Sequence, residues 1–298
     1  MFIHDKNVIY LNTARNCLHY IIQAYKIKQI FLPYYTCPVV WQSARKENCK
    51  IKFYHIDNNF MPVYDFKEND YVVYTNYFGI CAKNIESLAT KYKNLIVDNS
   101  QAFYMKNIGL ASFNSIRKFF GNSDGALLFC NQKQNIKLEQ DDSKQRLKEL
   151  LKRKSLKQKY VYTDFSNVDE FLIDEPIKLM SEQTKKFLFE IDFEQEKQHR
   201  LQNFNCLNQS LSEINELTIS LNSNDIPMYY PLLVKNKDFR QKMLKQGISM
   251  EQFWSPINSK TIESDFQKYI FPLPIDMRYT LNDMHRITKI ILDYFNQI

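Results

Sequence analysis

The segment 112–125 places one lysine in an apolar setting. Lys118 comes three residues after Ser115 and is followed directly by Phe119 and Phe120. Such neighbours disfavour the charged ammonium form and favour the neutral amine, which is the nucleophile. Two glycines then bracket a turn that leads into an apolar strand. The pattern indicates a lysine that takes part in chemistry, whereas a lysine taken at random is a solvated surface charge.

Two earlier segments supply the other parts of a reaction centre. Asp98 ends the apolar run 95–97, and α/β proteins bind ligands at the carboxyl edge of the sheet, where such an acid lies. Thr13 is a candidate N-cap, and Arg15 adds a guanidinium to the free N–H groups of a helix start, which bind anions. Taken singly, Asp98 also fits a helix cap or an Asx turn, and Thr13 fits an ordinary cap.

The order of these segments along the chain narrows the chemistry. An anion-binding turn comes first, an acid second, and Lys118 follows Asp98 by twenty residues. Pyridoxal phosphate (PLP) uses this set, because its phosphate needs N–H groups, hydroxyls and a cation, its ring nitrogen a carboxylate, and its aldehyde a lysine amine. The protonated ring then acts as an electron sink. The sequence therefore indicates a PLP enzyme in which Lys118 holds the cofactor.

Elements suited to position these residues alternate over the first 130 residues. Helices are expected over 15–25, 39–47 and 84–92, and short apolar strands at 28–32, 51–56, 71–77, 95–97 and 126–129. Strands that alternate with helices of this length predict βαβ units. The expected class is α/β, with a mostly parallel central sheet that helices cover on both faces.

The later part of the chain predicts a smaller unit. One long helix is expected over 182–211, a strand over 228–234, a helix over 237–246 that ends at Gly247, and a closing helix over 281–295. This division predicts a large PLP-binding α/β domain over 1–185 and a small C-terminal α+β domain over 186–298.

Length and composition describe an ordinary globular protein. The 298 residues can bury a substantial core, and 44% apolar with 24% charged residues is typical of soluble domains. No run approaches the roughly 18 apolar residues of a membrane span, and the first residues lack the apolar core of a secretory signal. We therefore expect a cytoplasmic protein with free cysteines. No CxxC, HxH or HxxxH pair occurs, so no metal site is expected.

The net charge of +7 is concentrated in one stretch. Residues 131–160 contain ten Lys or Arg and four Asp or Glu, which leaves the rest of the chain at +1. Leucines at roughly helical spacing, without interleaved aromatics before Tyr160, indicate a solvated, lysine-rich helical insertion. We expect no nucleic-acid binding. A contact of this insertion with an anionic partner or a membrane surface is the alternative.

Several motifs together resemble those of the DegT-type sugar aminotransferases, which are PLP-dependent transferases of fold type I, the aspartate-aminotransferase type. Residues 98–102 (DNSQA) are similar to the family's D-A-A-Q-A, and residues 76–79 (NYFG) to its H-L-Y-G. Residues 115–125 resemble the lysine segment, and residues 12–15 occupy the place of the Ser-Gly-Thr phosphate turn. Matches at 32–36, 53–57 and 273–287 extend the likeness over nearly the whole chain.

The resemblance implies a role for each matched residue. Asp98 would pair with the pyridine nitrogen, and Gln101 would approach the ring hydroxyl of the cofactor. Lys118 would form the Schiff base and, once displaced, move the proton between the substrate carbon and the cofactor. The residues that hold the phosphate would be Thr13, Ala14, Arg15 and Ser115.

Three departures accompany the likeness. The family's ring-stacking aromatic is Cys37 here, so Tyr34 or Tyr35 would have to replace it. The segment through which a partner subunit's asparagine reaches the phosphate is 177–181 here, and Lys178 supplies a cation instead. No N-terminal arm matches, and the basic insertion replaces the loop after the lysine.

The resemblance implies an aminotransferase that moves an amino group from glutamate to a keto-sugar or nucleotide-linked keto-sugar in surface-polysaccharide biosynthesis. It also implies a homodimer, because the neighbouring subunit completes each active site of the family. The related sugar dehydratases replace the lysine by histidine, so Lys118 argues against that activity. The alternative is a non-catalytic member of the same fold that acts as a binding or scaffolding subunit.

Overall fold

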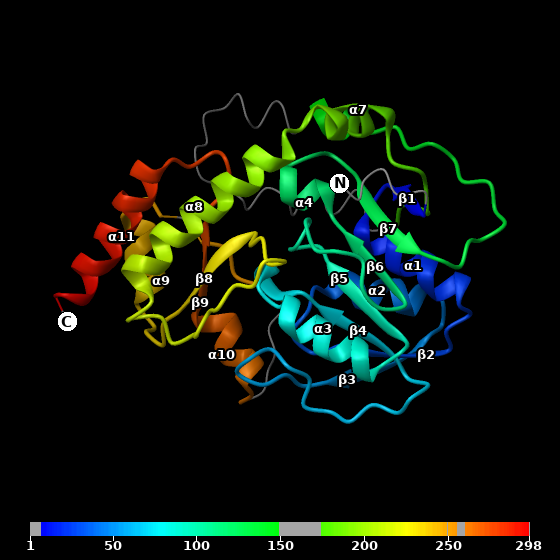
Figure 1. Ribbon diagram of the computed structural model, residues 1–298, viewed down its shortest axis with the longest axis horizontal. Coiled ribbons are helices and arrows are strands. Elements are labelled where there is room, and N and C mark those ends of the chain that lie inside the picture. The colour runs from blue at the N-terminus through cyan, green and yellow to red at the C-terminus, as the bar shows by residue number, and fades with distance from the viewer. Residues whose placement is uncertain (1–6, 149–173, 249, 255–259, 298) are drawn as a thin grey trace.

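The computed structural model describes residues 7–148, 174–248, 250–254 and 260–297. A seven-stranded sheet forms the larger part of the molecule. A two-stranded sheet forms the smaller part, which lies beside helices α8 (Phe193–Leu211) and α11 (Leu281–Phe295) at the left of Figure 1.

The large sheet has the strand order β1-β7-β6-β5-β4-β2-β3. Its strands are β1 (Val8–Leu11), β2 (Gln29–Pro33), β3 (Lys50–Tyr54), β4 (Tyr71–Thr75), β5 (Leu95–Asn99), β6 (Ala111–Asn114) and β7 (Ala126–Cys130). The pairings from β3 through β6 are parallel, and β7 runs against both of its neighbours. The predicted mostly parallel sheet is therefore confirmed. Because β1 and β6 both oppose β7, the carboxyl ends of β1, β5 and β6 lie at one edge.

Both faces of this sheet are buried, as the continuous apolar runs of its strands predicted. In β4, Val73 packs into the cluster under α1 and α2, whereas its neighbour Tyr74 packs into the cluster on the opposite face, with α3. The covering helices are α1 (Ala14–Ala24), α2 (Pro38–Lys46) and α3 (Ala82–Lys91). The α/β class is thus confirmed in its layers as well as in its strand order.

The stretch 182–211 forms two helices, so the prediction of one long helix is wrong. Helix α7 (Glu182–Glu190) ends before Ile191, whose backbone is extended. Helix α8 begins after Asp192, whose side chain accepts a hydrogen bond from the backbone N of Gln195 at 3.0 Å. An aspartate at this position satisfies one free N–H of the new helix, and the cap outweighs the apolar periodicity that runs across the break.

In the smaller part, helices pack on one pair of strands that are far apart in the sequence. Strands β8 (Tyr229–Leu233) and β9 (Ile270–Pro274) are antiparallel, and α8, α9 (Phe239–Lys245) and α11 bury a common cluster against them. Helix α10 (Ile262–Tyr269) leads into β9. The closing helix has its predicted bounds, and a capping box between Thr280 and Asp283 fixes its start.

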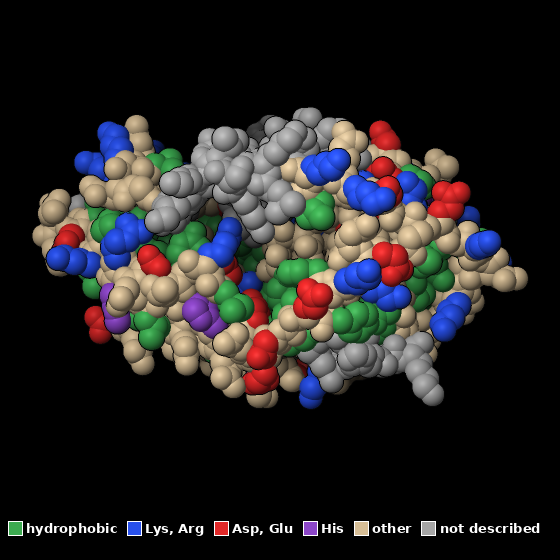
Figure 2. Space-filling model, turned by 90° about the horizontal axis from the view of Figure 1, so that it is seen from above, with side chains coloured by type: hydrophobic (Ala, Val, Ile, Leu, Met, Phe, Trp, Pro, Cys, Tyr) green, Lys and Arg blue, Asp and Glu red, His purple; other side chains and the backbone are tan. Residues whose placement is uncertain are grey.

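The described part of the basic insertion, residues 131–148, follows the surface of the large sheet's domain. Gln134 bonds to Tyr20 through its backbone N at 2.7 Å and through its side-chain amide at 2.9 Å, and a helical turn occupies 144–148. The rest of the predicted insertion, 149–160, lies outside the described residues. Acidic and basic side chains lie side by side on the face shown in Figure 2. None of the helices that the structure describes has the length and apolar character of a membrane span.

Candidate active site

Residues at or just after the carboxyl ends of β1, β5 and β6 meet at one edge of the large sheet. After β1, Thr13 caps α1, and its hydroxyl accepts the N–H of Asn16 at 3.2 Å. After β6, Ser115 caps the short helix α4 (Ile116–Phe120), and its hydroxyl accepts the N–H of Lys118 at 3.2 Å. Asp98 is the next-to-last residue of β5. Ligands of open α/β sheets bind at this edge, so the topology brings the three segments to the expected place.

A hollow at this edge collects six of the seven residues that the sequence motifs identified. It encloses about 520 Å³ of empty space, including its open mouth. The six residues are Thr13, Ala14, Arg15, Asp98, Ser115 and Lys118. Cys37, Ser100 and Arg117 also line it. An amine, an acid and two guanidinium groups therefore share one hollow.

Asp98 supplies a buried acid. Its side chain belongs to a residue that is 5% exposed, and one carboxylate oxygen accepts the N–H of Ser100 at 2.9 Å. Burial raises the pKa of Asp98, and the hydrogen bond from Ser100 and the charge of Lys118 oppose that rise only in part. A buried carboxylate of this kind is stabilised by a cation placed beside it. The site is therefore suited to hold a protonated ring nitrogen.

Arg117 is a lining residue that sequence reasoning missed. It is 5% exposed, its N–H donates to the carbonyl of Gly125 at 3.2 Å, and its own carbonyl accepts the N–H of Asn122 at 3.1 Å. With Arg15 it places two guanidinium groups near the start of α1, which suits a doubly charged anion. The available signal was its position next to Lys118. A five-residue helix, however, has too little periodicity to show which side chains face the hollow.

Gln101 does not line the hollow. Its side-chain oxygen accepts the N–H of Phe78 at 2.8 Å, within the short 3-10 helix η2 (Tyr77–Gly79). Phe78 has a φ of 56° there, and the backbone of Gly79 follows with a φ of 77°. A Cβ at Gly79 would lie 2.6 Å from the carbonyl oxygen of Gln101, so this turn requires glycine. The expected approach of Gln101 to a cofactor ring stays a prediction.

Neither tyrosine that was expected to stack on a cofactor ring lines the hollow. Tyr35 is buried with its ring centroid 4.6 Å from that of Trp254, and Tyr34 stacks on His55 at 4.5 Å. Cys37 forms the wall at this position. Among the described lining residues, the aromatic one is Phe113.

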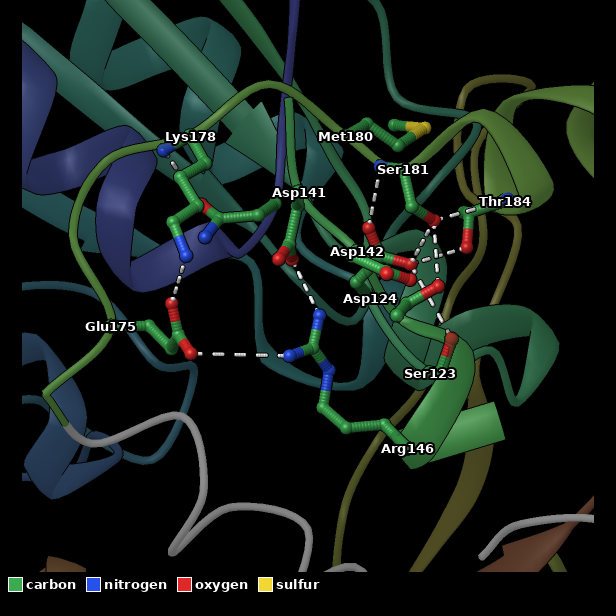
Figure 3. Close-up of polar contacts among 12 residues, drawn as sticks. Ser123, Asp124, Asp141, Asp142, Arg146, Glu175, Lys178, Met180, Ser181 and Thr184 are labelled. Carbon is green, nitrogen blue, oxygen red and sulfur yellow. Dashed lines mark hydrogen bonds and ion pairs between the residues drawn. The ribbon is translucent and has the colours of Figure 1, made fainter. Parts of the chain in front are cut away.

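The buried carboxylate of Asp124 ties the lysine segment to the start of α7, as Figure 3 shows. It accepts hydrogen bonds from the backbone N and the hydroxyl of Ser181, both at 2.8 Å, and from the hydroxyl of Thr184. The next residue, Gly125, donates its N–H to the carbonyl of Asn12 at 2.6 Å. These contacts hold the loop after the lysine against both α7 and the turn at 12–15.

We expect Asp124→Ala to lower the free energy of unfolding by about 3 kcal/mol, because hydrogen bonds to a charged group contribute roughly 1.5–3 kcal/mol each and the buried donors would lose their acceptor. Denaturation with urea measures the change. Asp142→Ala is the matched control, since the Asp142 side chain is 68% exposed, and a change within about 0.5 kcal/mol is expected there. Equal losses in the two variants would contradict the role given to Asp124.

Lys178 lies beside the turn at 12–15 of its own chain. Its carbonyl accepts the N–H of Asn12 at 3.0 Å, and its Nζ lies 2.8 Å from a carboxylate oxygen of Glu175. The hydrogen bond to Glu175 raises the pKa of Lys178. The guanidinium group of Arg146 lies 4.0 Å from a carboxylate oxygen of Glu175 and forms an ion pair with Asp141, as Figure 3 shows. Lys178 therefore has its carbonyl bound to Asn12 and its ammonium group bound to Glu175 of the same chain.

A second buried network holds the other end of α4 to the smaller part. Arg200, which is 2% exposed, donates to the carbonyl of Phe119 at 3.1 Å and to that of Met228 at 3.0 Å. It also pairs with Glu196, which accepts the hydroxyl of Tyr104 at 2.6 Å. Sequence reasoning missed this network because its members come from four separate stretches of the chain.

No protein-family model and no curated protein matches this sequence. Solved structures do match it in three dimensions. A DegT DnrJ EryC1 StrS aminotransferase from Brucella abortus aligns over 96% of this chain and 85% of its own, with a TM-score of 0.63 and 14% identity. The Helicobacter pylori aminotransferase involved in the biosynthesis of pseudoaminic acid aligns over 98% and 87%, with a TM-score of 0.64 and 15% identity.

A third match is a Streptococcus pneumoniae protein in its PMP form, described as a candidate sugar aminotransferase. It aligns over 95% of this chain and 86% of its own, with a TM-score of 0.66 and 14% identity. At these identities the likeness concerns the fold. This chain has the fold of the DegT-type aminotransferases, which confirms the fold that its sequence motifs predicted.

Proposed function

We propose that this protein is a PLP-dependent aminotransferase and that it binds PLP in the hollow around Lys118. The observation that carries the proposal is the joint placement of an amine, a buried acid and two guanidinium groups at the carboxyl edge of the sheet. The fold supports the reaction class, because it is shared with a protein solved in its PMP form.

The donors of the hollow fit the parts of PLP. Arg15, Arg117 and backbone N–H groups at the start of α1 would hold the phosphate, and the cap hydroxyls of Thr13 and Ser115 can add hydrogen bonds. Asp98 would hold the ring nitrogen. When bound, PLP supplies an electron sink for negative charge on the substrate carbon.

The chain's own groups would do two things during the reaction. The Nζ of Lys118 would hold the cofactor's aldehyde carbon and, once displaced by the amino donor, take up and return the proton of the substrate carbon. Asp98 would keep the ring nitrogen protonated, since a positive charge beside it offsets the cost of its burial.

The acceptor that we propose is a keto-sugar, either free or nucleotide-linked, with glutamate as the donor, in a cytoplasmic pathway of surface-polysaccharide biosynthesis. Incubation of the PLP-loaded protein with glutamate tests the first half of the reaction. Mass spectrometry should detect 2-oxoglutarate together with the aminated cofactor. A protein that binds PLP and leaves glutamate unchanged would favour the non-catalytic alternative.

We expect Arg117→Gln to weaken PLP binding by about tenfold or more, because hydrogen bonds to charged groups contribute roughly 1.5–3 kcal/mol. The affinity for pyridoxal, which lacks the phosphate, should stay unchanged. Fluorescence titration with both compounds measures the difference. If the two affinities fall together, Arg117 supports the shape of the site and does not hold the phosphate.

We also propose a homodimer with an isologous interface. The 177–181 segment, which contacts Asn12 of its own subunit through the carbonyl of Lys178, would also approach the partner's phosphate across this interface. Lys178→Glu should then weaken PLP binding, whereas Lys144→Glu, in the basic insertion, should not. Light scattering gives the assembly state, and titration gives the affinity. A monomer that binds PLP normally, with Lys178→Glu silent, would overturn this part of the proposal.

A further inference from the structure

A second hollow shares Lys118 with the first. It lies between the end of α4, the junction of α7 and α8, and residues 276–278, and it encloses about 1270 Å³ of empty space, including its mouth. If the first hollow holds PLP, a substrate has to reach Lys118 from elsewhere, and the second hollow leads to the same side chain. The inference that follows rests on the proposed function, because it assigns this hollow to the substrate.

The guanidinium groups of the second hollow are engaged by acids of the same wall. Arg200 pairs with Glu196 and donates to two backbone carbonyls. Arg278 forms a two-point ion pair with Asp276, with N–O distances of 2.7 and 2.9 Å. A diphosphate group would have to compete with these carboxylates for each guanidinium.

Among the described residues of the α7–α8 junction that line the hollow, the other charged ones are acidic. Glu190 and Asp192 line the hollow and are exposed to solvent. Aromatic rings stand in the same wall, and they belong to Phe119, Phe120, Phe187 and Tyr229. Carboxylates next to aromatic faces attract cations and repel anions. Aromatic faces also offer a broad apolar surface to a ring-shaped ligand.

We infer that this hollow binds a carbohydrate that bears a free amino group and carries no diphosphate. The ammonium group would lie between the carboxylates of Glu190 and Asp192 and the nearby aromatic rings. The sugar ring would cover the apolar part of the wall. The proposed reaction forms its own amino group at Lys118, so the ammonium group held by Glu190 and Asp192 would be one that the acceptor already bears. Of the two proposed acceptors, this charge pattern selects the free sugar over the nucleotide-linked one.

Isothermal titration calorimetry with the purified protein tests the inference without measuring activity. Glucosamine and UDP-N-acetylglucosamine are the probes, and glucosamine should bind more tightly. The double variant Glu190→Gln/Asp192→Asn should weaken glucosamine binding about fivefold. The fold should persist, because asparagine caps a helix as well as aspartate does. Glu194→Gln is the matched control, since Glu194 is an exposed acid on the same helix outside the hollow.

Three results would contradict the inference: tighter binding of UDP-N-acetylglucosamine, glucosamine binding that the double variant leaves unchanged, or no glucosamine binding at millimolar concentration. Labelling of Lys118 with PLP tests the proposed function separately. A protein that is labelled and fails the sugar experiment would refute the substrate assignment alone. A protein that is never labelled would refute the proposed function itself.

Discussion

Lys118→Ala should leave a folded protein that binds no PLP covalently and has lost at least about a thousandfold in amino transfer, because the variant removes the nucleophile and the proton-transferring base together. The side chain of Lys118 is partly exposed at the hollow, and its helix is held by the cap of Ser115 and by Arg200. The backbone of α4 should therefore survive the change.

Absorbance and circular dichroism test this expectation together. The parent protein with PLP should show a visible absorption band that borohydride abolishes, and the variant should lack the band while it keeps the parent's far-ultraviolet spectrum. Lys93→Ala is a suitable control, because Lys93 pairs with Glu68 on the surface at 2.8 Å. A variant that retains both the band and the activity would show that another amine does the work of Lys118.

Asp98→Asn should keep PLP bound but slow amino transfer by about a hundredfold or more, because an unprotonated ring is a poor electron sink. The amide oxygen of asparagine can still accept the N–H of Ser100, so the strand end should keep its geometry. Single-turnover kinetics with glutamate measure the rate. A variant as fast as the parent would reduce Asp98 to the cap of a turn.

The same substitution has an expected effect on stability whose sign follows from the pKa of Asp98. Burial raises the pKa in the folded protein, so the folded state keeps a proton that the unfolded state has released. The parent's stability therefore falls as pH rises from about 4, the pKa of an exposed aspartate, through the raised folded value. Without PLP, Asp98→Asn should be at least as stable as the parent at pH 7, and denaturation at pH 4 and 7 measures the difference. A marked loss at pH 7 would assign Asp98 a structural role.

Local sequence signals predicted the first and last residues of most helices and strands to within one to three positions. Helix α11 is the clearest case, because an amphipathic pattern coincides with a capping box. Strand β9 shows the opposite case: Pro272 and Pro274 lack the N–H of a ladder residue, so local pattern did not predict a strand there, and only the family resemblance over 273–287 pointed to one. In the structure, Pro272 faces Pro231 across the two-stranded sheet, where both are tolerated. The break between α7 and α8 had a signal in Asp192 and Gln195, which the continuing periodicity concealed.

The candidate site could be predicted where its residues follow strand ends directly. Thr13 and Ser115 are caps, and the parallel topology brings them to one edge with Asp98. Strand ends do not predict which side chains point into the hollow, because the orientation of a side chain depends on tertiary contacts. Gln101 is turned to the N–H of Phe78 by a turn that only the folded chain contains. The anchoring of Asp124 by Ser181 joins residues that are 57 positions apart.

Peptide mapping after borohydride reduction tests the central claim most directly. The PLP-saturated protein would be reduced, digested and analysed by mass spectrometry, with the protein treated in the absence of PLP as the control. The account predicts one pyridoxyl group, on the peptide that contains Lys118. A pyridoxyl group on a different lysine, or none in the saturated protein, would contradict it.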